Sequence, residues 1–348
     1  MTDALPFFED NAQSPSTDDG TAMTMVSMLR QDLVVADRYD DRGSIVRLDL
    51  VRADGSVLPA FSAGAHVEIE IASLEDGRSL RRRYSLWGDP TDRYRWRLGI
   101  LLSPASRGGS QALHTRAHRG SRIAVGPPAN DFPLAPEGAA VLVGGGIGIT
   151  PLLAMAHTLT AEGRPFVLHY VTRSAGRTAF LDLLPTFPFA DRIRLHHDDG
   201  IGALPFDPTR DLTAPDDDAH LYVCGPAGFM DHCTAAARGL GWAAPRIHQE
   251  AFGADVDTTG STFEVVARRS AVTVRVGPQE TIANALSGAG VPVELSCGEG
   301  VCGACACDVV EGKPDHRDHV LTDEEKARGD QILICCSRAL GARLVLDL

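Results

Sequence analysis

The sequence predicts a multidomain protein with β and α/β folds: a β region, then an α/β region, then a small β-grasp region at the C-terminus. Short segments of alternating hydrophobicity, separated by Gly, Pro and Asp turns, run from Met28 to Phe132. The stretch "AAVLVGGGIGITPLLAMAHTL" that follows is typical of a strand, a glycine-rich turn and a helix. The last region carries "CGEGVCGACAC", and its flanks have the strand and helix patterns of a β-grasp domain.

Length and composition narrow the class of protein. A chain of 348 residues is long enough for two or three domains, and 44% hydrophobic with 23% charged residues is typical of a globular protein. The net charge of −13 argues against nucleic acid and against an anionic membrane surface as partners. No signal peptide or membrane span is predicted, so we expect a cytoplasmic protein with a flexible tail over 1–24.

The β region contains two candidate ligand-binding stretches, "RRRYSLWGDP" and "SRGGSQALH". Arg82 and Arg107 can bind a phosphate, and Tyr84 can stack on a planar ring. Gly108 and Gly109 can let a ligand approach the backbone closely. From these residues alone, a solvated arginine-rich strand followed by an ordinary turn is an equally good interpretation.

The α/β region contains a candidate anion site. A predicted strand over 139–143 leads through four glycines to a helix, for which Thr150 is the expected N-cap and Pro151 a first-turn residue. Unpaired N–H groups and the helix dipole would face a phosphate there. The pattern from Gly146 to Pro151 is G-x-G-x-x-P, which differs from the usual dinucleotide fingerprint, and no acidic residue ends the next strand.

A second strand and turn, "HLYVCGPAGFMDHC", repeats this arrangement at Cys224, Gly225 and Pro226. Ligands bind at the carboxyl ends of strands in open α/β sheets, so we expect the two turns to form one cleft. Cys224 would either contact a planar ring or be a small core residue, and we prefer the first interpretation.

The cysteine-rich loop gives the most specific signal. The spacing C-x4-C-x2-C with a distant fourth cysteine is the plant-type [2Fe–2S] ferredoxin pattern, whereas zinc sites prefer two C-x2-C pairs or one pair with two histidines. Soft thiolates suit iron–sulfur chemistry, and the interleaved glycines let backbone N–H groups point at the sulfurs. Zinc binding and buried structural cysteines are the alternatives. The expected ligands are Cys297, Cys302, Cys305 and one of the adjacent pair Cys335 and Cys336, which the spacing alone does not separate.

Taken in order, "RRYS", "SRGGS", "GGGIGITP", "CGP", "HQEAFG" and the ferredoxin pattern resemble the phthalate dioxygenase reductase family, which includes vanillate O-demethylase reductases. The resemblance runs from Met28 to Leu348. It implies a six-stranded antiparallel flavin-binding β-barrel, a ferredoxin-reductase-type α/β nucleotide-binding domain and a C-terminal β-grasp [2Fe–2S] domain. The implied parts are a tail at 1–24, the FMN-binding barrel at 25–134, the NAD-binding domain at 135–253, a linker at 254–261 and the ferredoxin domain at 262–348.

The resemblance also implies roles for single residues. Ser85 would lie near the reactive flavin nitrogen, and Phe252 would shield the flavin ring where the nicotinamide stacks; with Cys224 they form the implied catalytic set. The implied cluster ligands are Cys297, Cys302, Cys305 and Cys335, so the resemblance favours Cys335 over Cys336. The other implied flavin contacts are Arg82, Tyr84, Gly99, Ile100, Leu101, Arg107, Gly108, Gly109, Ser110 and Thr150, and the implied nucleotide contacts are Gly146, Gly148, Cys224, Gly225 and Pro226.

The implied function is electron transfer from NADH through FMN and the [2Fe–2S] cluster to a separate Rieske-type oxygenase, a dioxygenase or an O-demethylase. The chain contains no oxygenase motif, and the hydride step needs no general acid or base, so we expect histidines such as His196 and His197 to be surface or structural residues. The alternatives are a reductase for a cytochrome P450 or another haem acceptor, and a non-redox zinc-binding interaction protein. Arg173 leaves NADPH open as the donor, although NADH is expected. The "TDEE" stretch is expected to start a helix rather than to steer a partner.

Overall fold

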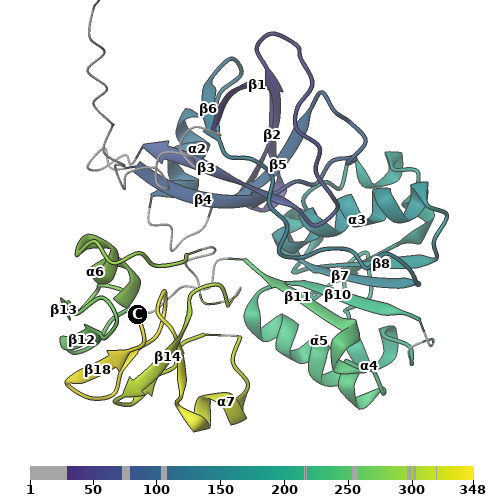
Figure 1. The fold of residues 1–348 in the computed structure, drawn as a ribbon. Helices are drawn as coiled ribbons and strands as arrows, with labels where there is room; N and C mark the ends of the chain where they lie inside the picture. Colours follow the sequence, from purple (N-terminus) through teal and green to yellow (C-terminus); the bar gives the residue numbers. More distant parts are fainter. Residues whose placement is uncertain are drawn as a thin grey trace, which may run out of the picture.

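The computed structural model describes residues 30–72, 79–102, 108–214, 216, 218–252, 258–295, 300, 303–318 and 320–348. The predicted tail at 1–24 and the first half of the predicted linker, 254–257, lie outside these residues, as do Arg107, Cys297 and Cys302. The chain forms three main sheets, which follow one another from blue through teal to yellow in Figure 1. The domain limits inferred from the sequence stay predictions.

The first sheet has six strands in the order β4-β3-β6-β1-β2-β5, and every pairing is antiparallel. A bridge between Leu86, which follows β4, and Leu98 on β5 joins the two ends of this order, which closes the sheet into a barrel. Alternate side chains fill its interior. The elements are β1 (Gln31–Asp41), η1 (Arg42–Ser44), β2 (Ile45–Arg52), β3 (His66–Ala72), β4 (Ser79–Ser85), β5 (Trp96–Leu101), α2 (Gly109–Arg116) and β6 (Arg122–Val125).

The second sheet is parallel, with the strand order β11-β10-β7-β8-β9. Its first elements are β7 (Ala140–Gly145), η2 (Gly146–Gly148), α3 (Ile149–Ala161), β8 (Phe166–Thr172), η3 (Ala175–Arg177), η4 (Leu184–Thr186) and η5 (Ala190–Arg192). The remaining elements are β9 (Ile193–His197), α4 (Pro208–Asp211), β10 (His220–Gly225), α5 (Ala227–Gly239), η6 (Ala244–Arg246) and β11 (Ile247–Ala251).

Helices cover both faces of this parallel sheet. Leu142 on β7 belongs to the core formed with α3, whereas its neighbour Val143 belongs to the core formed with α5. Adjacent strand residues point to opposite faces, so α3 and α5 pack on opposite sides. A continuous apolar run such as "AVLV" is what a strand buried on both faces requires.

The glycine-rich turn differs from the sequence prediction in two details. β7 continues to Gly145, because Gly144 and Gly145 still pair with β8. The predicted N-cap role of Thr150 is wrong: η2 runs directly into α3, so the helix begins at Ile149 and Thr150 is already helical. Pro151 lies in the first turn as predicted, where a missing N–H costs no hydrogen bond.

The third sheet has the order β13-β12-β18-β14-β16, in which only β12 and β18 pair in parallel, and α6 packs against its core. This is the β-grasp arrangement expected from the sequence. The elements are β12 (Phe263–Ala267), β13 (Val272–Val276), α6 (Ile282–Gly288), β14 (Ala306–Glu311), β15 (Pro314–Asp315), α7 (Asp323–Arg328), β16 (Gln331–Leu333), β17 (Arg338–Ala339) and β18 (Arg343–Leu346).

Both helices of this region begin at threonine caps. The Thr281 hydroxyl accepts a hydrogen bond from Asn284 N at the start of α6. Thr322 and Glu325 form a reciprocal capping box at the start of α7, which confirms the "TDEE" stretch as a helix start. Across the described ranges, none of the helices is both long and apolar enough to span a membrane.

We predict that Thr281→Ala lowers the free energy of unfolding of the ferredoxin region by about 1 kcal/mol, because the first turn of α6 loses its side-chain acceptor. Urea unfolding of the full chain followed by circular dichroism measures this change. The control is Ser287→Ala, at an exposed position near the end of the same helix. An equal loss in both variants would contradict the capping role.

Candidate functional site

The two glycine-rich turns of the parallel sheet lie against each other, as expected from the sequence. A Cβ atom on Gly148 would lie 2.2 Å from the carbonyl oxygen of Cys224, and one on Gly225 would lie 3.1 Å from Cα of Gly145. Gly148 therefore requires glycine, and a larger residue at Gly225 would have to push its neighbours slightly apart. Gly146 has φ +57°, and no atom lies within 4 Å of where its Cβ would be, so its backbone faces open space.

Cys224 and Phe252 flank this edge from neighbouring strands. The Cys224 side chain is fully buried, and burial raises the pKa of its thiol well above the ordinary value. Phe252 directly follows β11 and packs, partly buried, against the same apolar core. Cys224 therefore acts as a small core residue in this structure, and its contact with a planar ring stays a prediction.

Glu250 is a candidate site residue that the sequence analysis missed. It pairs in register with Cys224, and its Oε2 atom is buried with no hydrogen-bond partner among the described residues. Burial, with a smaller contribution from Asp131 and an opposing one from Arg83, raises the pKa of its carboxyl to about 8. At neutral pH the carboxyl is therefore mostly protonated and can donate a hydrogen bond. The sequence signal that could have identified Glu250 was its position in the "HQEAFG" motif, two residues before the predicted site residue Phe252.

The barrel contributes a buried hydroxyl with no partner. Ser85 ends β4, is 3% exposed, and its Oγ atom has no hydrogen-bond partner within the described part of the chain. Buried polar atoms are nearly always paired, so this hydroxyl fits contact with a bound polar ligand. Tyr84, the preceding residue, packs partly buried against the barrel core.

The start of α2 lies beside the arginine-rich strand β4. Gly108 has φ +90° at the N-cap, and a Cβ atom on Gly109 would lie 2.9 Å from Cγ of Arg82. Ser110 is buried in the same turn. The structure thus brings three predicted ligand residues of α2 next to Arg82. A helix N-terminus beside a guanidinium group suits a phosphate group.

The barrel and the parallel sheet meet at Gly99 on β5. A Cβ atom there would lie 3.0 Å from Cγ2 of Thr150, so β5 directly contacts the turn that follows β7. The Thr150 hydroxyl donates to the carbonyl oxygen of Ile147 at 3.0 Å. Ile100 points into the barrel core, and Leu101 is partly exposed at the strand end. A ligand against this strand would therefore meet mainly backbone atoms.

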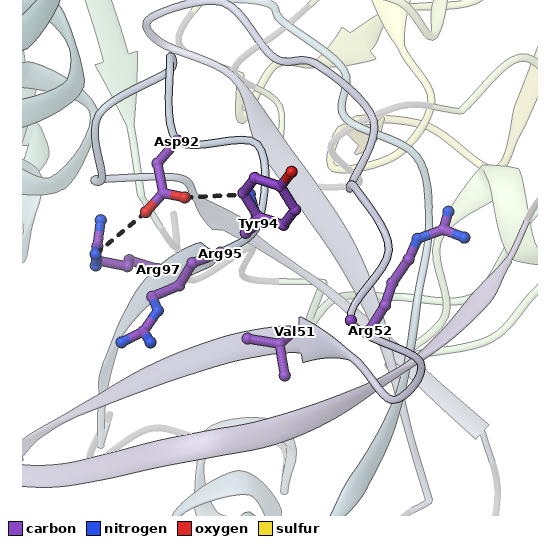
Figure 2. A pocket seen from close by; sticks show the side chains of 7 residues that line it. Val51, Arg52, Asp92, Tyr94, Arg95 and Arg97 are labelled. Carbon is purple, nitrogen blue, oxygen red and sulfur yellow. Dashed lines mark hydrogen bonds and ion pairs between the residues drawn. The ribbon is translucent and has the colours of Figure 1, made fainter.

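A hollow of about 620 Å³ lies elsewhere on the barrel (Figure 2). Two of its arginines lie against acids, Arg97 at 3.3 Å from Asp92 and Arg95 at 2.6 Å from Asp49, and the third, Arg52, donates to Gln31 Oε1 at 2.7 Å. We assign no ligand to it. The lining residues are Val51, Arg52, Gly55, Asp92, Tyr94, Arg95 and Arg97, none of which is a predicted site residue.

Two of the four predicted cluster ligands lie in neighbouring segments of the third region. Cys305 and Cys335 are both buried, and Ile334 N donates to the carbonyl oxygen of Cys305 at 3.3 Å. Cys336 is buried as well, and a Cβ atom on Gly300 would lie 2.6 Å from its sulfur. Cys336 thus fills the space directly beside Gly300.

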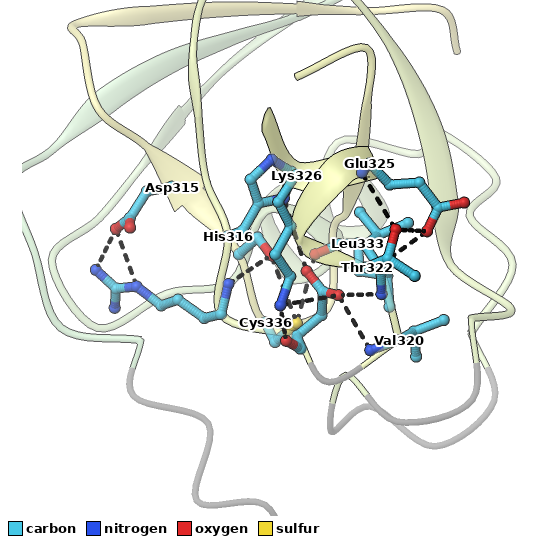
Figure 3. Close-up of polar contacts among 12 residues, drawn as sticks. Asp315, His316, Val320, Thr322, Glu325, Lys326, Leu333 and Cys336 are labelled. Atoms are coloured by element: carbon cyan, nitrogen blue, oxygen red, sulfur yellow. Dashed lines mark hydrogen bonds and ion pairs between the residues drawn. The ribbon is translucent and has the colours of Figure 1, made fainter. Parts of the chain in front are cut away.

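A buried carboxylate lies close to Gly300, among the polar contacts of Val320 and Lys326 that Figure 3 draws. The fully buried Asp318 side chain accepts hydrogen bonds from Leu321 N at 2.8 Å and Val320 N at 3.2 Å. Lys326 Nζ donates to the Asp318 carbonyl oxygen at 2.7 Å. Cα of Asp318 lies 3.3 Å from where a Cβ atom on Gly300 would be. These hydrogen bonds hold Asp318 in place beside Gly300.

Comparison with known proteins agrees with this arrangement. Residues 265–340 match the family model described as 2Fe-2S iron-sulfur cluster binding domain. A vanillate O-demethylase oxidoreductase of Pseudomonas sp. (strain HR199 / DSM 7063) is 44% identical over 87% of this chain and 95% of its own. The solved phthalate dioxygenase reductase superposes with a TM-score of 0.74 at 35% identity, over 92% of this chain and 99% of that one. An intact type IV self-sufficient cytochrome P450 monooxygenase gives a TM-score of 0.69 at 32% identity, over 97% of this chain and 43% of that one.

The barrel, the parallel sheet with its two glycine-rich turns and the ferredoxin-type region together define a pyridine-nucleotide-dependent flavin and iron–sulfur oxidoreductase. The chain belongs to the phthalate dioxygenase reductase family, together with the vanillate O-demethylase oxidoreductases.

We predict that Glu250→Gln changes how stability depends on pH. The unfolded chain releases this proton near the ordinary carboxyl pKa of 4.5, whereas the folded chain keeps it up to about 8. Between these values ionisation favours unfolding, so wild-type stability falls as pH rises, by at most about 1.4 kcal/mol per pH unit from this group.

The variant lacks this proton, so its unfolding free energy relative to wild type should increase from pH 5 to pH 8. Urea unfolding followed by tryptophan fluorescence across that range measures the difference. Glu137→Gln, at an exposed carboxyl, is the control and should keep the wild-type profile. A constant difference between Glu250→Gln and wild type at all pH values would show that Glu250 ionises normally.

Proposed function

We propose that the chain is the reductase component of a two-component oxygenase system, carrying electrons from NADH through FMN and a [2Fe–2S] cluster to a separate Rieske-type oxygenase. The observation that carries this proposal is a ferredoxin-type region on the same chain as the flavin barrel and the nucleotide-binding sheet. Near full-length relatives named as vanillate O-demethylase oxidoreductase and phthalate dioxygenase reductase support it.

The residues of the barrel fit a bound flavin. Ser85 would offer its unpaired hydroxyl to a polar atom of the ring, and the backbone of Gly99 would lie along the ring. Arg82 and the N–H groups at Gly109 would hold the phosphate. FMN is proposed over FAD on family resemblance. When bound, the flavin and the cluster would convert a two-electron donor into a source of single electrons.

The parallel sheet would hold the nucleotide at its two turns, with the open backbone of Gly146 facing the phosphates and Phe252 covering the ring position. The surroundings of Arg173 support NADH over NADPH as the donor. Asp199 N donates to the carbonyl oxygen of Arg173 at 3.3 Å, so two exposed aspartates, Asp198 and Asp199, lie beside it. Their negative charge opposes binding of a 2′-phosphate there.

A reductase for a cytochrome P450 is the second candidate function, because nearly the whole chain superposes on part of a self-sufficient P450 monooxygenase. The resemblance to separate oxygenase reductases favours the Rieske-type acceptor. Electron delivery to purified acceptors separates the two candidates: rapid reduction of a P450, with none of a Rieske-type oxygenase, would favour the second.

The main test is an absorption spectrum with metal and flavin analysis of freshly purified, reconstituted protein. We expect visible bands of both a flavin and a [2Fe–2S] cluster, with about one FMN and two irons per chain from the plant-type pattern. NADH should bleach the flavin bands. Zinc in place of iron, or a protein that retains no flavin after reconstitution, would contradict the proposed function.

We predict that Cys335→Ser abolishes electron delivery to the acceptor protein, because an essential thiolate ligand is lost. Reduction of the flavin by NADH should persist, since that step does not involve the ferredoxin region. Stopped-flow absorbance separates the two steps. The matched variant is Cys336→Ser, at the neighbouring buried thiol, which should keep the cluster. The reverse result would identify Cys336 as the fourth ligand.

A further inference from the structure

A buried arginine of the barrel forms one ion pair inside the barrel region and a second one across the boundary with the parallel sheet. Arg47 on β2 is only 7% exposed, and its Nε atom lies 2.9 Å from Oδ2 of Asp41 at the end of β1. Its Nη2 atom donates to Asp182 at 3.0 Å. Asp182 belongs to the segment between β8 and β9, so the arginine connects the two regions.

The backbones of the two regions also meet closely at this point. Asp41 accepts a hydrogen bond from Phe180 N at 2.9 Å through the carboxylate oxygen that faces Arg47. Gly43, in the turn between β1 and β2, has φ +67°, and a Cβ atom on it would lie 2.9 Å from the carbonyl oxygen of Arg177. A larger residue at Gly43 would displace the backbone of the parallel-sheet region at Arg177.

Phe180 is the apolar part of this contact. It is fully buried and has φ +61°, a conformation that side-chain-bearing residues rarely adopt. Its ring lies edge-to-face with Trp87 of the barrel, with centroids 5.1 Å apart, and the Arg47 guanidinium lies 5.6 Å from its centroid. The hydrogen bond to Asp41 therefore holds an unusual backbone conformation that directs the ring towards Trp87 and β5 at the boundary.

The ring reaches the strand that is proposed to line the flavin. Cζ of Phe180 lies 3.2 Å from where a Cβ atom on Gly99 would be. Thr150 and Ile147 of the nucleotide-binding turn reach the same point, at 3.0 and 3.2 Å. Phe180 and that turn therefore contact β5 side by side, so a shift of Phe180 would move the nucleotide-binding turn relative to the strand.

We propose that Asp41, Arg47 and Phe180 form an inter-domain clasp whose task is to position the nucleotide-binding turns against the flavin-lining strand. They are positioning residues, since they act on the reacting groups through Gly99 and Thr150. The inference rests on the proposed function, because it concerns hydride transfer from the bound nucleotide to the bound flavin. Such transfer between bound groups depends steeply on their distance and orientation.

The test compares Arg47→Gln with Arg47→Lys and with the control Arg95→Gln, which removes an ion pair inside the barrel, Arg95–Asp49 at 2.6 Å. The first readout is the stopped-flow rate constant for flavin reduction at saturating NADH in the holoenzyme. We expect a loss of about tenfold or more for Arg47→Gln, partial recovery with Arg47→Lys and a wild-type value for Arg95→Gln. The dissociation constant for NADH should change by less than the rate constant.

The second readout needs neither flavin nor activity. Hydrogen–deuterium exchange at Phe180 N, in the apoprotein, should be faster in Arg47→Gln and unchanged in Arg95→Gln. If Arg47→Gln does not fold, Asp182→Asn takes its place. This variant removes only the ion pair between Arg47 and Asp182, whose side chain is 63% exposed, and should give a smaller change in the same direction.

Wild-type reduction and exchange rates in both Arg47→Gln and Asp182→Asn would overturn the clasp. Equal losses in Arg95→Gln would overturn it too, because the effect would then be one of general stability. A wild-type protein that NADH does not reduce would instead contradict the proposed function, and exchange at Phe180 would still decide whether the clasp exists.

Discussion

The structure depends on one close contact, the one between β5 of the barrel and the turn that follows β7. The absence of a side chain at Gly99 lets Thr150, Ile147 and Phe180 approach the strand to ordinary contact distance. The strand proposed to line the flavin and the turn proposed to hold the nucleotide are thus parts of one boundary. A second contact of the same kind, Gly148 against the Cys224 carbonyl, joins the two turns of the parallel sheet.

Local features of the sequence predicted much of this architecture. The apolar run before the glycines predicted β7, and the strand and helix patterns near the C-terminus predicted β12, β13 and α6. The order of the motifs predicted the family. These features are set by residues close together in the chain, where propensity and periodicity act. The cap of α3 was mispredicted, because a continuous 3₁₀ turn gives its first residue a helical conformation without a side-chain cap.

The features that the sequence did not predict join residues far apart in the chain. The contact between Asp41 and Phe180 spans 139 residues, and Arg47 reaches Asp182 across 135. None of these four residues lies in a local sequence pattern that would predict its distant partner. The burial of Glu250 likewise arises only when the sheet edge meets the barrel, near Arg83 and Asp131. Candidate cofactor residues could be predicted because they lie in local motifs. The contacts that support them could not be predicted, because those contacts join distant parts of the chain.

The depth of the thiols in the ferredoxin region has a consequence for how the protein matures. Cys305 and Cys335 are 4% and 2% exposed and are joined by a backbone hydrogen bond between their segments. If these two thiols are the proposed cluster ligands, iron and sulfide would reach them more easily while the two segments are apart. Metal ligands that are buried on folding couple metal binding to folding, so assembly of the proposed cluster would accompany the closing of these segments.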